Sequence, residues 1–385
     1  MEVTKDIKYI GVNDYDADLF EGQYILEKGM AYNSYVILDE KVAVMDTVDK
    51  IALDRWMSNL KEALGERKPD YLIVQHLEPD HSAGIDILAN EYPDMKIICS
   101  AAALRMIPNF CDTAIDRFEG VKENDTLSLG EHTLTFVMAP MVHWPEVMVS
   151  YDSKDKVLFS ADAFGKFGTV DADEAWNCEA RRYYFNIVGK YGKQVQALLK
   201  KTSALDIEII CPLHGPVLSD TIPEVLNLYN IWSAYEPEDK GVFIACASIH
   251  GNTMQAAKAL KSMLEEKGCP KVAFADLTRD DIAECVEDGF RHSHLVLMAS
   301  SYDAGVFTPM SDYLHHLQSK GFCNRTVALV ENASWAPSAV RTMKSELEAM
   351  KNITLVDKTV TIKTRVSDAA LAELNELADE IMKSF

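Results

Sequence analysis

The stretch Gln75-His76-Leu77-Glu78-Pro79-Asp80-His81 decides how the first half of this sequence is interpreted. It follows the apolar run 71–74 and precedes the segment 85–88, whose apolar residues have helical spacing. The loop between a buried strand and a helix therefore carries four side chains that can bind a metal ion. They are those of His76, Glu78, Asp80 and His81. Imidazole and carboxylate groups together suit iron, manganese or zinc.

Three further histidine and aspartate residues follow predicted strands in the same way. They are His143 after the strand 133–138, Asp162 after the strand 157–160, and His214 after the strand 207–210. In an acidic chain such residues also lie near one another by chance, and each of the three alone is more typical of a turn than of a metal site. The repeated placement at strand ends, where a rigid base can aim several side chains at one point, predicts a shared metal site.

Length and composition limit the classes of protein that the sequence can encode. A chain of 385 residues predicts two domains, or three, and an apolar fraction of 48% is enough to fill their cores. No stretch has the length needed to cross a bilayer, and the start 1–6 leads into no apolar signal segment, so we expect a cytoplasmic protein without membrane attachment. The net charge of -22 repels nucleic acid, which is not an expected partner.

The cysteine residues indicate a reducing compartment. None of them forms a C-x-x-C pair, and several lie in apolar runs, where a free thiol behaves as a small hydrophobic group. This pattern argues against a disulfide scaffold, an iron–sulfur cluster or a fused rubredoxin-type site. The eight cysteines are Cys99, Cys111, Cys178, Cys211, Cys246, Cys269, Cys285 and Cys323.

The order of predicted strands and helices changes after the short charged segment 236–240. This segment contains a proline and is the best candidate for a linker. Beyond it, strands alternate regularly with helices, which predicts a doubly wound parallel sheet. The five predicted strands are 242–245, 272–274, 295–298, 326–329 and 353–356, and a helix over 368–383 follows them.

Three loops at the carboxyl edge of this predicted sheet have a composition that suits a ligand. The first is Ser248-Ile249-His250-Gly251-Asn252-Thr253, whose small polar residues at a helix N-terminus form a cradle for phosphate. It contains neither G-K-[ST] nor G-x-G-x-x-G, and taken alone a plain helix cap explains it equally well. The second and third loops are Ser300-Ser301-Tyr302-Asp303-Ala304-Gly305-Val306-Phe307 and Glu331-Asn332-Ala333-Ser334-Trp335-Ala336-Pro337. Their aromatic residues and backbone N–H groups suit an isoalloxazine ring.

The motif H-x-E-x-D-H at residues 76–81, followed by His143, Asp162 and His214, resembles the metal site of the metallo-β-lactamase fold. Hydrolases of that fold usually have H-x-H-x-D-H and bind zinc. This chain has Glu78 at the second position, and a carboxylate there favours iron. Together with the stretch His143-Trp144-Pro145-Glu146, this substitution resembles the flavodiiron proteins, also called A-type flavoproteins. The three later loops resemble a flavodoxin domain that binds FMN.

The resemblance implies an α/β chain in two parts. Residues 1–236 would form a metallo-β-lactamase-like αββα sandwich with a di-iron centre, and residues 241–385 a flavodoxin-like doubly wound parallel sheet with FMN. One iron would be held by His76, Glu78 and His143. The other would be held by Asp80 and His214, with His81 as a further candidate, and Asp162 would bridge the pair. FMN would contact the loops 248–253, 300–305 and 332–335, in which His250 departs from the commoner tyrosine or threonine.

The same resemblance implies an oxidoreductase. It would pass electrons from FMN to the di-iron centre, which would reduce dioxygen to water, nitric oxide to nitrous oxide, or both. The external electron donor would be a rubredoxin or a reduced deazaflavin cofactor, and the protein would form a head-to-tail homodimer or a tetramer. Trp144, Tyr24 and Tyr32 are candidates for influencing the choice of gas, although core packing explains each of them as well.

Two other functions stay open at this point. The first is a zinc hydrolase of the same fold with an appended flavodoxin domain, in which a metal-bound hydroxide attacks an ester or amide. The second is a flavin electron carrier that retains the N-terminal half as a docking module. We also expect one long amphipathic helix over 181–201. The remaining histidines, His132, His292, His294, His315 and His316, are interpreted as surface or structural residues.

Overall fold

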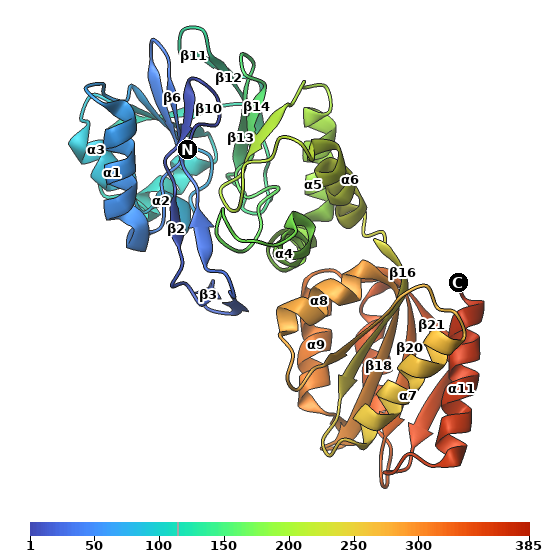
Figure 1. Ribbon diagram of the computed structural model, residues 1–385. Coiled ribbons are helices and arrows are strands. Elements are labelled where there is room, and N and C mark those ends of the chain that lie inside the picture. Colours follow the sequence, from blue (N-terminus) through green and yellow to red (C-terminus); the bar gives the residue numbers. More distant parts are fainter. Residues whose placement is uncertain (114) are drawn as a thin grey trace. The chain divides into compact units, whose positions relative to one another are not determined.

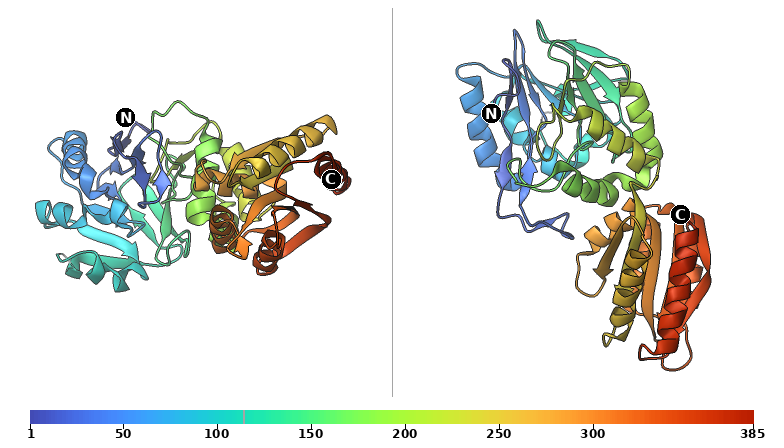
Figure 2. Two further views of the ribbon diagram at one scale, coloured as in Figure 1. Left: turned by 90° about the horizontal axis from the view of Figure 1, so that it is seen from below. Right: turned by 45° about the vertical axis from the view of Figure 1, so that its right-hand side comes forward.

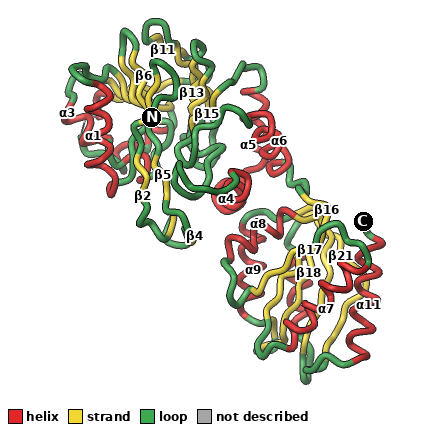
Figure 3. The backbone as a smooth tube through the Cα atoms, in the orientation of Figure 1, coloured by secondary structure: helices red, strands yellow, loops and turns green. Residues whose placement is uncertain are grey.

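The computed structural model describes residues 1–113 and 115–385. The chain forms two compact units, Met1–Asn230 and Ile231–Phe385, and Figure 3 shows strands inside each unit with helices outside them. The division lies within α6 (Ile222–Ser233), and β16 (Asp239–Ala247) begins inside the predicted linker 236–240. In this described part of the chain, none of the helices combines the length and the apolar character needed to cross a membrane.

The first unit is built on two sheets. The first sheet consists, in spatial order, of β1 (Ile7–Tyr9), β6 (Tyr35–Leu38), β7 (Val42–Met45), β8 (Tyr71–Val74), β9 (Lys96–Ser100) and β10 (Phe118–Val121). The second sheet consists of β11 (Thr126–Ser128), β12 (Thr133–Met138), β13 (Met148–Asp152), β14 (Val157–Phe159) and β15 (Ile209–Cys211). Strands β7 to β10 are parallel neighbours, as are β14 and β15, and the other neighbours are antiparallel.

Helices cover the outer faces of these sheets, which gives the predicted αββα layers (Figure 1). On the side of the first sheet they are α1 (Leu53–Leu64), α2 (Pro79–Ser82) and α3 (Ile85–Glu91). On the side of the second sheet they are α4 (Trp176–Tyr183), α5 (Gly192–Thr202) and α6. Two short ribbons complete the unit: β2 (Val12–Asp14) with β5 (Met30–Tyr32), and the hairpin of β3 (Leu19–Phe20) and β4 (Tyr24–Ile25).

Alternate residues of the strands fill the space between the two sheets. Tyr35 and Ile37 of β6 point into the same buried cluster as Leu134 and Phe136 of β12. Successive side chains of a strand point to opposite faces, so a spacing of two residues selects the inner face. The buried aromatic and aliphatic groups fix the two sheets against each other and so provide a rigid base for the loops at the strand ends.

The loop 75–81 is held by two residues that follow the neighbouring strand β7. The carboxylate of Asp46 accepts hydrogen bonds from the backbone N–H of Gln75, at 2.7 Å, and from the side-chain amide of Gln75, at 3.0 Å. The hydroxyl of Thr47 donates to the carbonyl of His81 at 2.6 Å. Both ends of the loop are therefore tied to β7, and Asp80 and His81 lie in the single turn of α2.

The loop after β15 is held by Asn33. Its side-chain amide donates to the carbonyls of Pro212 and Gly215, each at 2.8 Å, and the amide is fully buried. The hydroxyl of Tyr35 donates to the same Pro212 carbonyl at 2.8 Å. These bonds enclose His214 on both sides and fix the position of its backbone.

The predicted single helix over 181–201 is wrong. The structure has α4, then a π-helical turn over Tyr184–Val188, a 3₁₀ turn over Gly189–Tyr191, and then α5. An amphipathic pattern does not report such a turn, because one inserted residue changes the hydrogen bonding without removing the apolar stripe. The consequence is that Tyr183, the last residue of α4, faces the interior of the unit.

The second unit has the predicted doubly wound sheet. Its parallel strands are, in spatial order, β17 (Val272–Asp276), β16, β18 (His292–Tyr302), β20 (Cys323–Asn332) and β21 (Lys351–Ile362), and the short β19 (Gly305–Val306) pairs with β18. The helices are α7 (Asn252–Glu266), α8 (Ile282–Arg291), α9 (Thr308–Ser319), α10 (Ala339–Glu348) and α11 (Asp368–Lys383). Figure 2 shows α7 and α11 along one face of the sheet, where their apolar residues form one core with the strands.

Replacing Asn33 by alanine should lower the free energy of unfolding by about 2 kcal/mol, because it removes two buried hydrogen bonds and takes the side-chain donor away from the Gly215 carbonyl. It should also reduce the metal content of the purified protein, since the backbone around His214 loses its support. Asn59 is a matched control, because its amide also donates to two carbonyls, those of Ile10 and Gly11, away from His214. Urea unfolding and metal analysis of both alanine variants test this. Full metal content in the Asn33 variant would contradict the role given to Asn33.

Candidate metal centre and cofactor cavity

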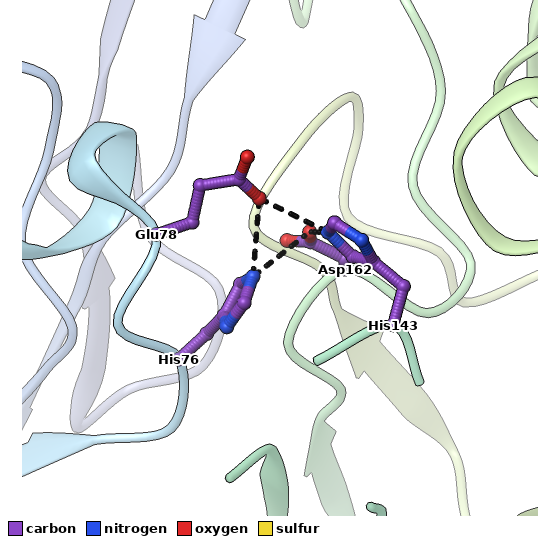
Figure 4. Close-up of side chains that lie close together, drawn as sticks. All are labelled: His76, Glu78, His143 and Asp162. Carbon is purple, nitrogen blue, oxygen red and sulfur yellow. Dashed lines mark hydrogen bonds and ion pairs between the residues drawn. The ribbon is translucent and has the colours of Figure 1, made fainter. Parts of the chain in front are cut away.

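Four of the predicted ligands form a first group at the edge where the two sheets meet. They are His76, Glu78, His143 and Asp162, and Figure 4 shows their side chains pointing toward one another. One oxygen of Glu78, Oε2, lies 3.2 Å from His76 Nε2 and 3.0 Å from His143 Nε2. Asp162 Oδ2 lies 3.1 Å from His143 Nε2 and 3.6 Å from His76 Nε2. Such spacings match the edges between ligand atoms that share one metal ion.

The other three predicted ligands form a second group. It consists of Asp80, His81 and His214, all of which are buried. The two Nε2 atoms of His81 and His214 approach each other to 3.1 Å, and each lies 3.3 Å from Asp80 Oδ2. Two imidazole nitrogens and a carboxylate oxygen therefore meet at one point.

Asp162 lies between the two groups. Its Oδ2 faces the first group, whereas its Oδ1 lies 3.2 Å from His81 Nε2 and 3.9 Å from His214 Nε2 in the second. One buried carboxylate therefore presents one oxygen to each group. The structure brings all seven predicted ligands into one double cluster.

The tautomers of two of these histidines are set by the partners of their other nitrogen. His76 Nδ1 donates to Glu146 Oε1 at 2.8 Å, and His214 Nδ1 donates to the carbonyl of Ala31 at 2.8 Å. Each bond leaves the lone pair of Nε2 directed into the cluster, as a metal ligand requires. Glu146 was quoted in the sequence motif but was not predicted to have a role. Glu146 meets His76 only in the folded chain, so only the tertiary structure identifies this contact.

The electrostatics of the cluster favour positive charge between its members. Burial disfavours charged His76, but the carboxylates of Asp162, Glu146 and Glu78 outweigh it and raise the pKa of His76 well above its usual value. Burial also lowers the pKa of His143, but hydrogen bonds with Asp162 and Glu78 outweigh this effect and raise the pKa to about 9. Burial alone would raise the pKa of Glu78, yet bonds from His143 and His76 lower it to about 2. A metal cation would supply this positive charge in place of protons.

Unpartnered polar atoms in the interior support the fit to metal ions. Both carboxylate oxygens of Asp80, the Oδ1 of Asp162 and the Nδ1 of His81 are buried and have no hydrogen-bond partner in the described structure. A buried carboxylate without a hydrogen bond is costly unless positive charge lies beside it, because it loses its hydration without compensation. Coordination of metal ions by Asp80 and Asp162 would remove that cost.

Backbone conformations around the ligands are unusual. Ala161 and Phe164, on either side of Asp162, have φ angles of 50° and 67°, and Met141 near His143 has a φ angle of 65°. For residues other than glycine, this left-handed region costs about 1 kcal/mol or more. The surrounding packing maintains these conformations, which aim the ligands out of the strand ends into the cluster.

Aromatic side chains form a wall over the second group, and no sequence pattern marked the main members of this wall. The ring of Tyr183 lies 5.6 Å from that of His214, and the ring of Phe20 lies 5.3 Å from it. Phe167 packs on both Phe20 and Tyr183, at 5.7 and 5.1 Å between ring centres. The Tyr183 hydroxyl is fully buried and has no hydrogen-bond partner in the described structure. Burial and the charges of Asp162, Glu78 and Asp80 raise its pKa well above the usual value, which keeps the phenol protonated.

Two of the three residues named as candidates for influencing the choice of gas lie against the ligands. The Trp144 ring is 5.2 Å from that of His76, and the Tyr32 ring is 6.1 Å from that of His214. The hydroxyl of Tyr24 donates to the carbonyl of Asn186 at 3.1 Å, which makes this residue a support for the π-helical turn.

A third set of metal-capable groups lies outside this site. His132, interpreted from the sequence as a surface or structural residue, is fully buried and its Nδ1 lies 3.0 Å from Asp152 Oδ2, near Asp155. Lys154 already brings a cation to the same area, 2.8 Å from Asp6. We interpret the His132–Asp152 pair as structural, because it joins the turn before β12 to the end of β13.

The second unit contains a cavity of about 730 Å³ at the carboxyl edge of its parallel sheet. All three predicted ligand loops line it, and Trp335 and Tyr302 are 81% and 45% exposed there. The volume is in the range of small-molecule and cofactor sites. Two exposed aromatic side chains beside the N-terminus of α7 fit a ligand with a flat ring system and an anionic group.

The lining of the cavity differs from the prediction in several positions. Gly251 and Gly305 belong to the predicted loops but are not among the lining residues. Ala336 and Pro337 belong to the third predicted loop but were not among the predicted contacts, and sequence reasoning missed Ser338, Arg341 and Thr364. Thr364 follows β21 at the same edge. Ligands of such sheets bind beyond the carboxyl ends of the strands, and applying this rule to the fifth predicted strand would have identified Thr364. Arg341 lies inside α10, and no local signal marks it.

Comparison with known proteins agrees with this architecture. The family model described as ODP family beta lactamase matches residues 30–215. The chain is 32% identical to an uncharacterized protein of Methanocaldococcus jannaschii over 276 residues, which cover 70% of this chain and 69% of that protein. It is 29% identical to the anaerobic nitric oxide reductase flavorubredoxin of Salmonella typhi over 360 residues, which cover 90% and 74%.

Among solved structures, the fold matches that of the rubredoxin oxygen:oxidoreductase from Desulfovibrio gigas. The TM-score is 0.92 at 24% identity, and the match covers 100% of this chain and 98% of that chain. At this identity the likeness shows the fold, and the relatives found by sequence together with the family model show the family. The chain belongs to the flavodiiron proteins. In this flavodiiron protein, the double cluster lies in the metallo-β-lactamase-like unit and the cavity lies in the flavodoxin-like unit.

Replacing Asp162 by asparagine should remove both metal ions, because an amide offers only one oxygen and no charge to the two groups. Replacing Asp80 by asparagine should remove only the ion of the second group. Metal analysis of the purified variants, with circular dichroism to verify folding, distinguishes these outcomes. Equal metal loss in both variants would contradict the bridging position of Asp162.

Proposed function

We propose that this flavodiiron protein passes electrons from FMN to a di-iron centre, which reduces dioxygen to water, nitric oxide to nitrous oxide, or both. The observation that supports this most strongly is the placement of Asp162, whose two oxygens face two separate ligand groups. A single-metal site has no need for a buried carboxylate in that position. The relatives named as a nitric oxide reductase and an oxygen oxidoreductase support the same proposal.

The assignment of ligands follows from the two groups. His76, Glu78 and His143 would hold one iron, Asp80 and His214 would hold the other, and Asp162 would bridge them. His81 would be a further ligand of the second iron, because its Nε2 points at Asp80 and Asp162. Its ring is less firmly fixed than those of His76 and His214, since its Nδ1 has no hydrogen-bond partner among the residues that the structure describes.

Glu78 supports iron over the zinc of a hydrolase. Its carboxylate, together with those of Asp80 and Asp162, makes the ligand set anionic and rich in oxygen, which suits iron better than zinc. The zinc hydrolase therefore remains the weaker alternative. The flavin electron carrier is weaker still, because a docking module would not need seven converging metal ligands.

When bound, FMN and the two irons supply the electrons for reducing a diatomic gas. The chain's own residues shape the place where this happens. Phe20 and Phe167 exclude bulk water from the second group, which strengthens the electrostatic interactions inside. Tyr183 holds a protonated hydroxyl beside the carboxylates of both groups, and we propose that it donates a hydrogen bond to the bound gas.

The electron donor, the oligomer and the location are proposed on the family resemblance. The donor would be a rubredoxin or a reduced deazaflavin cofactor, and the protein would be cytoplasmic. The two sites belong to separate units of the chain. A head-to-tail homodimer, or a tetramer built from two of them, would bring the FMN of one subunit to the irons of its partner.

The test of the function begins with metal and flavin analysis of the purified protein. We expect iron and FMN, whereas zinc would favour the hydrolase and FMN alone would favour the carrier. The protein is then reduced completely without air and divided between a solution of dioxygen and one of nitric oxide. Fast loss of at least one gas, measured with electrodes, is expected. Loss of neither gas from iron-loaded protein would overturn the proposal.

Replacing Tyr183 by phenylalanine should lower kcat/KM for the gas about threefold to tenfold, the effect of losing one buried hydrogen bond. Iron and FMN contents should stay unchanged. Tyr313→Phe is a matched control, because the buried Tyr313 hydroxyl also has no hydrogen-bond partner in the described part of the chain but lies in the flavodoxin-like unit. Steady-state gas consumption by both variants tests the role. Equal activity of the Tyr183 variant and the native protein would exclude it.

The head-to-tail arrangement can be tested by mixing two inactive variants. Asp162→Asn lacks metal, and Ala304→Trp places a bulky side chain in the cavity and should lack FMN. After subunit exchange, half of the dimers are mixed and each has one working pair of sites, so about a quarter of the native activity should return. Size-exclusion chromatography with light scattering gives the oligomeric state. A monomer with full turnover, or no recovered activity, would contradict this arrangement.

A further inference from the structure

A continuous set of aromatic side chains leads from the segment after Asp162 toward the surface of the first unit. Phe164, two residues after Asp162, packs on the ring of Tyr229 of α6, with 4.3 Å between the ring centres. The Tyr229 ring in turn lies 6.4 Å from the ring of Trp176, the first residue of α4, and 29° separates the two ring planes. The three rings therefore form one path that begins beside the metal centre.

A hydrogen bond joins this path to the backbone next to the metal centre. The N–H of Phe164 donates to the hydroxyl of Tyr229 at 2.5 Å. From Asp162, the connection therefore runs along two residues of backbone and across one hydrogen bond to the phenol. Burial raises the pKa of Tyr229, the Phe164 N–H lowers it, and the charge of Asp162 raises it further. The pKa of Tyr229 thus lies well above its usual value, and the phenol carries its proton.

A second connection from the metal centre reaches the same phenol. It begins at Tyr183, whose ring lies 5.6 Å from that of His214. The next residue in the chain, Tyr184, packs edge-on against Tyr229, with 5.1 Å between the ring centres. Tyr229 is therefore the position at which both connections meet.

The two ends of the path differ in exposure. Tyr229 is fully buried, whereas Trp176 is partly exposed. Molecules in solution can therefore reach the indole of Trp176 but not the phenol of Tyr229. An electron that enters or leaves this part of the protein can do so through Trp176.

The residue types on the path suit electron transfer. A phenol or an indole can give up one electron when it also releases the proton of its O–H or N–H group. A phenylalanine ring has no such group and is much harder to oxidise, which applies to Phe20 and Phe167 in the wall over the second group. Rings that pack against one another exchange electrons readily, because their π orbitals lie close together. Tyr229 and Trp176 are therefore the oxidisable pair that leads outward.

We propose that Tyr229 and Trp176 form a protective electron path, which supplies electrons to the metal centre when FMN is not reduced and moves the resulting oxidation to the protein surface. The inference rests on the proposed function, in which the centre reduces dioxygen. Each of the two rings gives one electron, and each loses the proton of its O–H or N–H group in the same step.

The electrons and protons of this reaction balance. Reduction of dioxygen to two water molecules takes four electrons and four protons. When FMN is oxidised, two reduced irons supply only two electrons. Tyr229 and Trp176 supply the other two electrons and two protons, and the solvent supplies the remaining two protons. The products are two water molecules, a tyrosyl radical and a tryptophanyl radical.

The surface end of the path allows the rings to be restored. A reductant in solution, such as ascorbate or a thiol, returns an electron and a proton to the accessible Trp176. Trp176 then passes an electron and a proton to the Tyr229 radical, and a second molecule of reductant restores Trp176 again. The oxidation is thereby removed from the interior, where it would otherwise damage the ligand histidines.

The test uses the full chain, loaded with iron and freed of flavin. Its irons are reduced without air, the excess reductant is removed, and the protein is mixed with dioxygen and frozen at successive times for EPR spectroscopy. The native protein should show tyrosyl and tryptophanyl radicals, and peptide mass spectrometry should find oxidation at Trp176. Ascorbate added after the dioxygen should remove the tyrosyl signal from the native protein. In Trp176→Phe the tyrosyl signal should remain in ascorbate.

Three further variants assign the signals. Trp176→Tyr should regain the loss of the tyrosyl signal in ascorbate, because tyrosine is also oxidisable. Tyr229→Phe, with its iron content verified, should lose the tyrosyl signal. Trp56→Phe is the matched control, because Trp56 is a fully buried tryptophan of α1 in the same unit and is not part of the path. It should behave as the native protein does.

Two results would overturn the inference. The first is native protein that holds reduced iron and consumes dioxygen without forming either radical. The second is equal loss of the tyrosyl signal in ascorbate from Trp176→Phe and the native protein, which would leave the rings with a packing role only. Failure of the proposed function looks different, because protein with iron and reduced FMN would then consume neither dioxygen nor nitric oxide.

Discussion

The structure of the first unit depends on one buried carboxylate, that of Asp162. Imidazole nitrogens of four histidines lie between 3.1 and 3.9 Å from its two oxygens: those of His76, His81, His143 and His214. A negative charge in the protein interior is unfavourable unless positive charge or coordination compensates it. The four rings therefore have to converge on Asp162 from different parts of the chain, and the rest of the unit makes that convergence rigid.

That rigidity comes from the two packed sheets. The ligands leave the ends of β8, β12, β14 and β15, which belong to both sheets. The inner faces of the sheets pack into one apolar cluster, so the strand ends cannot move independently. Hydrogen bonds from Asn33 and Asp46 then tie the ligand loops to neighbouring strands. Such a framework places ligands accurately and tolerates the unusual backbone angles beside Asp162.

The second unit meets a different requirement. A ligand with a flat ring and a phosphate binds along an extended surface, whereas a metal ion needs charged groups that converge on one point. The carboxyl edge of a parallel sheet provides a row of loops and helix N-termini that face one side. The aromatic side chains of Tyr302 and Trp335 remain exposed there, and the hydroxyl groups of Thr253 and Ser300 lie 3.1 Å apart at the base of the cavity. Most of the polar lining residues are serine, threonine and asparagine, which are also common in ordinary turns and helix caps, so the sequence signal of the cavity is weaker than that of the metal ligands.

The sequence by itself indicated which residues are candidates for the chemistry and which elements carry those residues. Strand periodicity and the histidine and carboxylate residues just beyond strand ends located all seven ligand candidates, and the alternation of strands and helices predicted the order of a doubly wound sheet. These signals are local, because each depends on residues only a few positions apart. The three loops of the cavity were found by the same reasoning.

Only the tertiary structure decided how these residues are divided and what supports them. Asp162 faces both groups, Glu146 fixes the ring of His76, and a π-helical turn after Tyr183 accompanies the placement of a phenol against His214. Arg341 reaches the cavity from a helix, with no motif to mark it. Each of these relations joins positions that are far apart in the chain. They arise from the packing of whole sheets and helices, and the sequence around each residue does not indicate them.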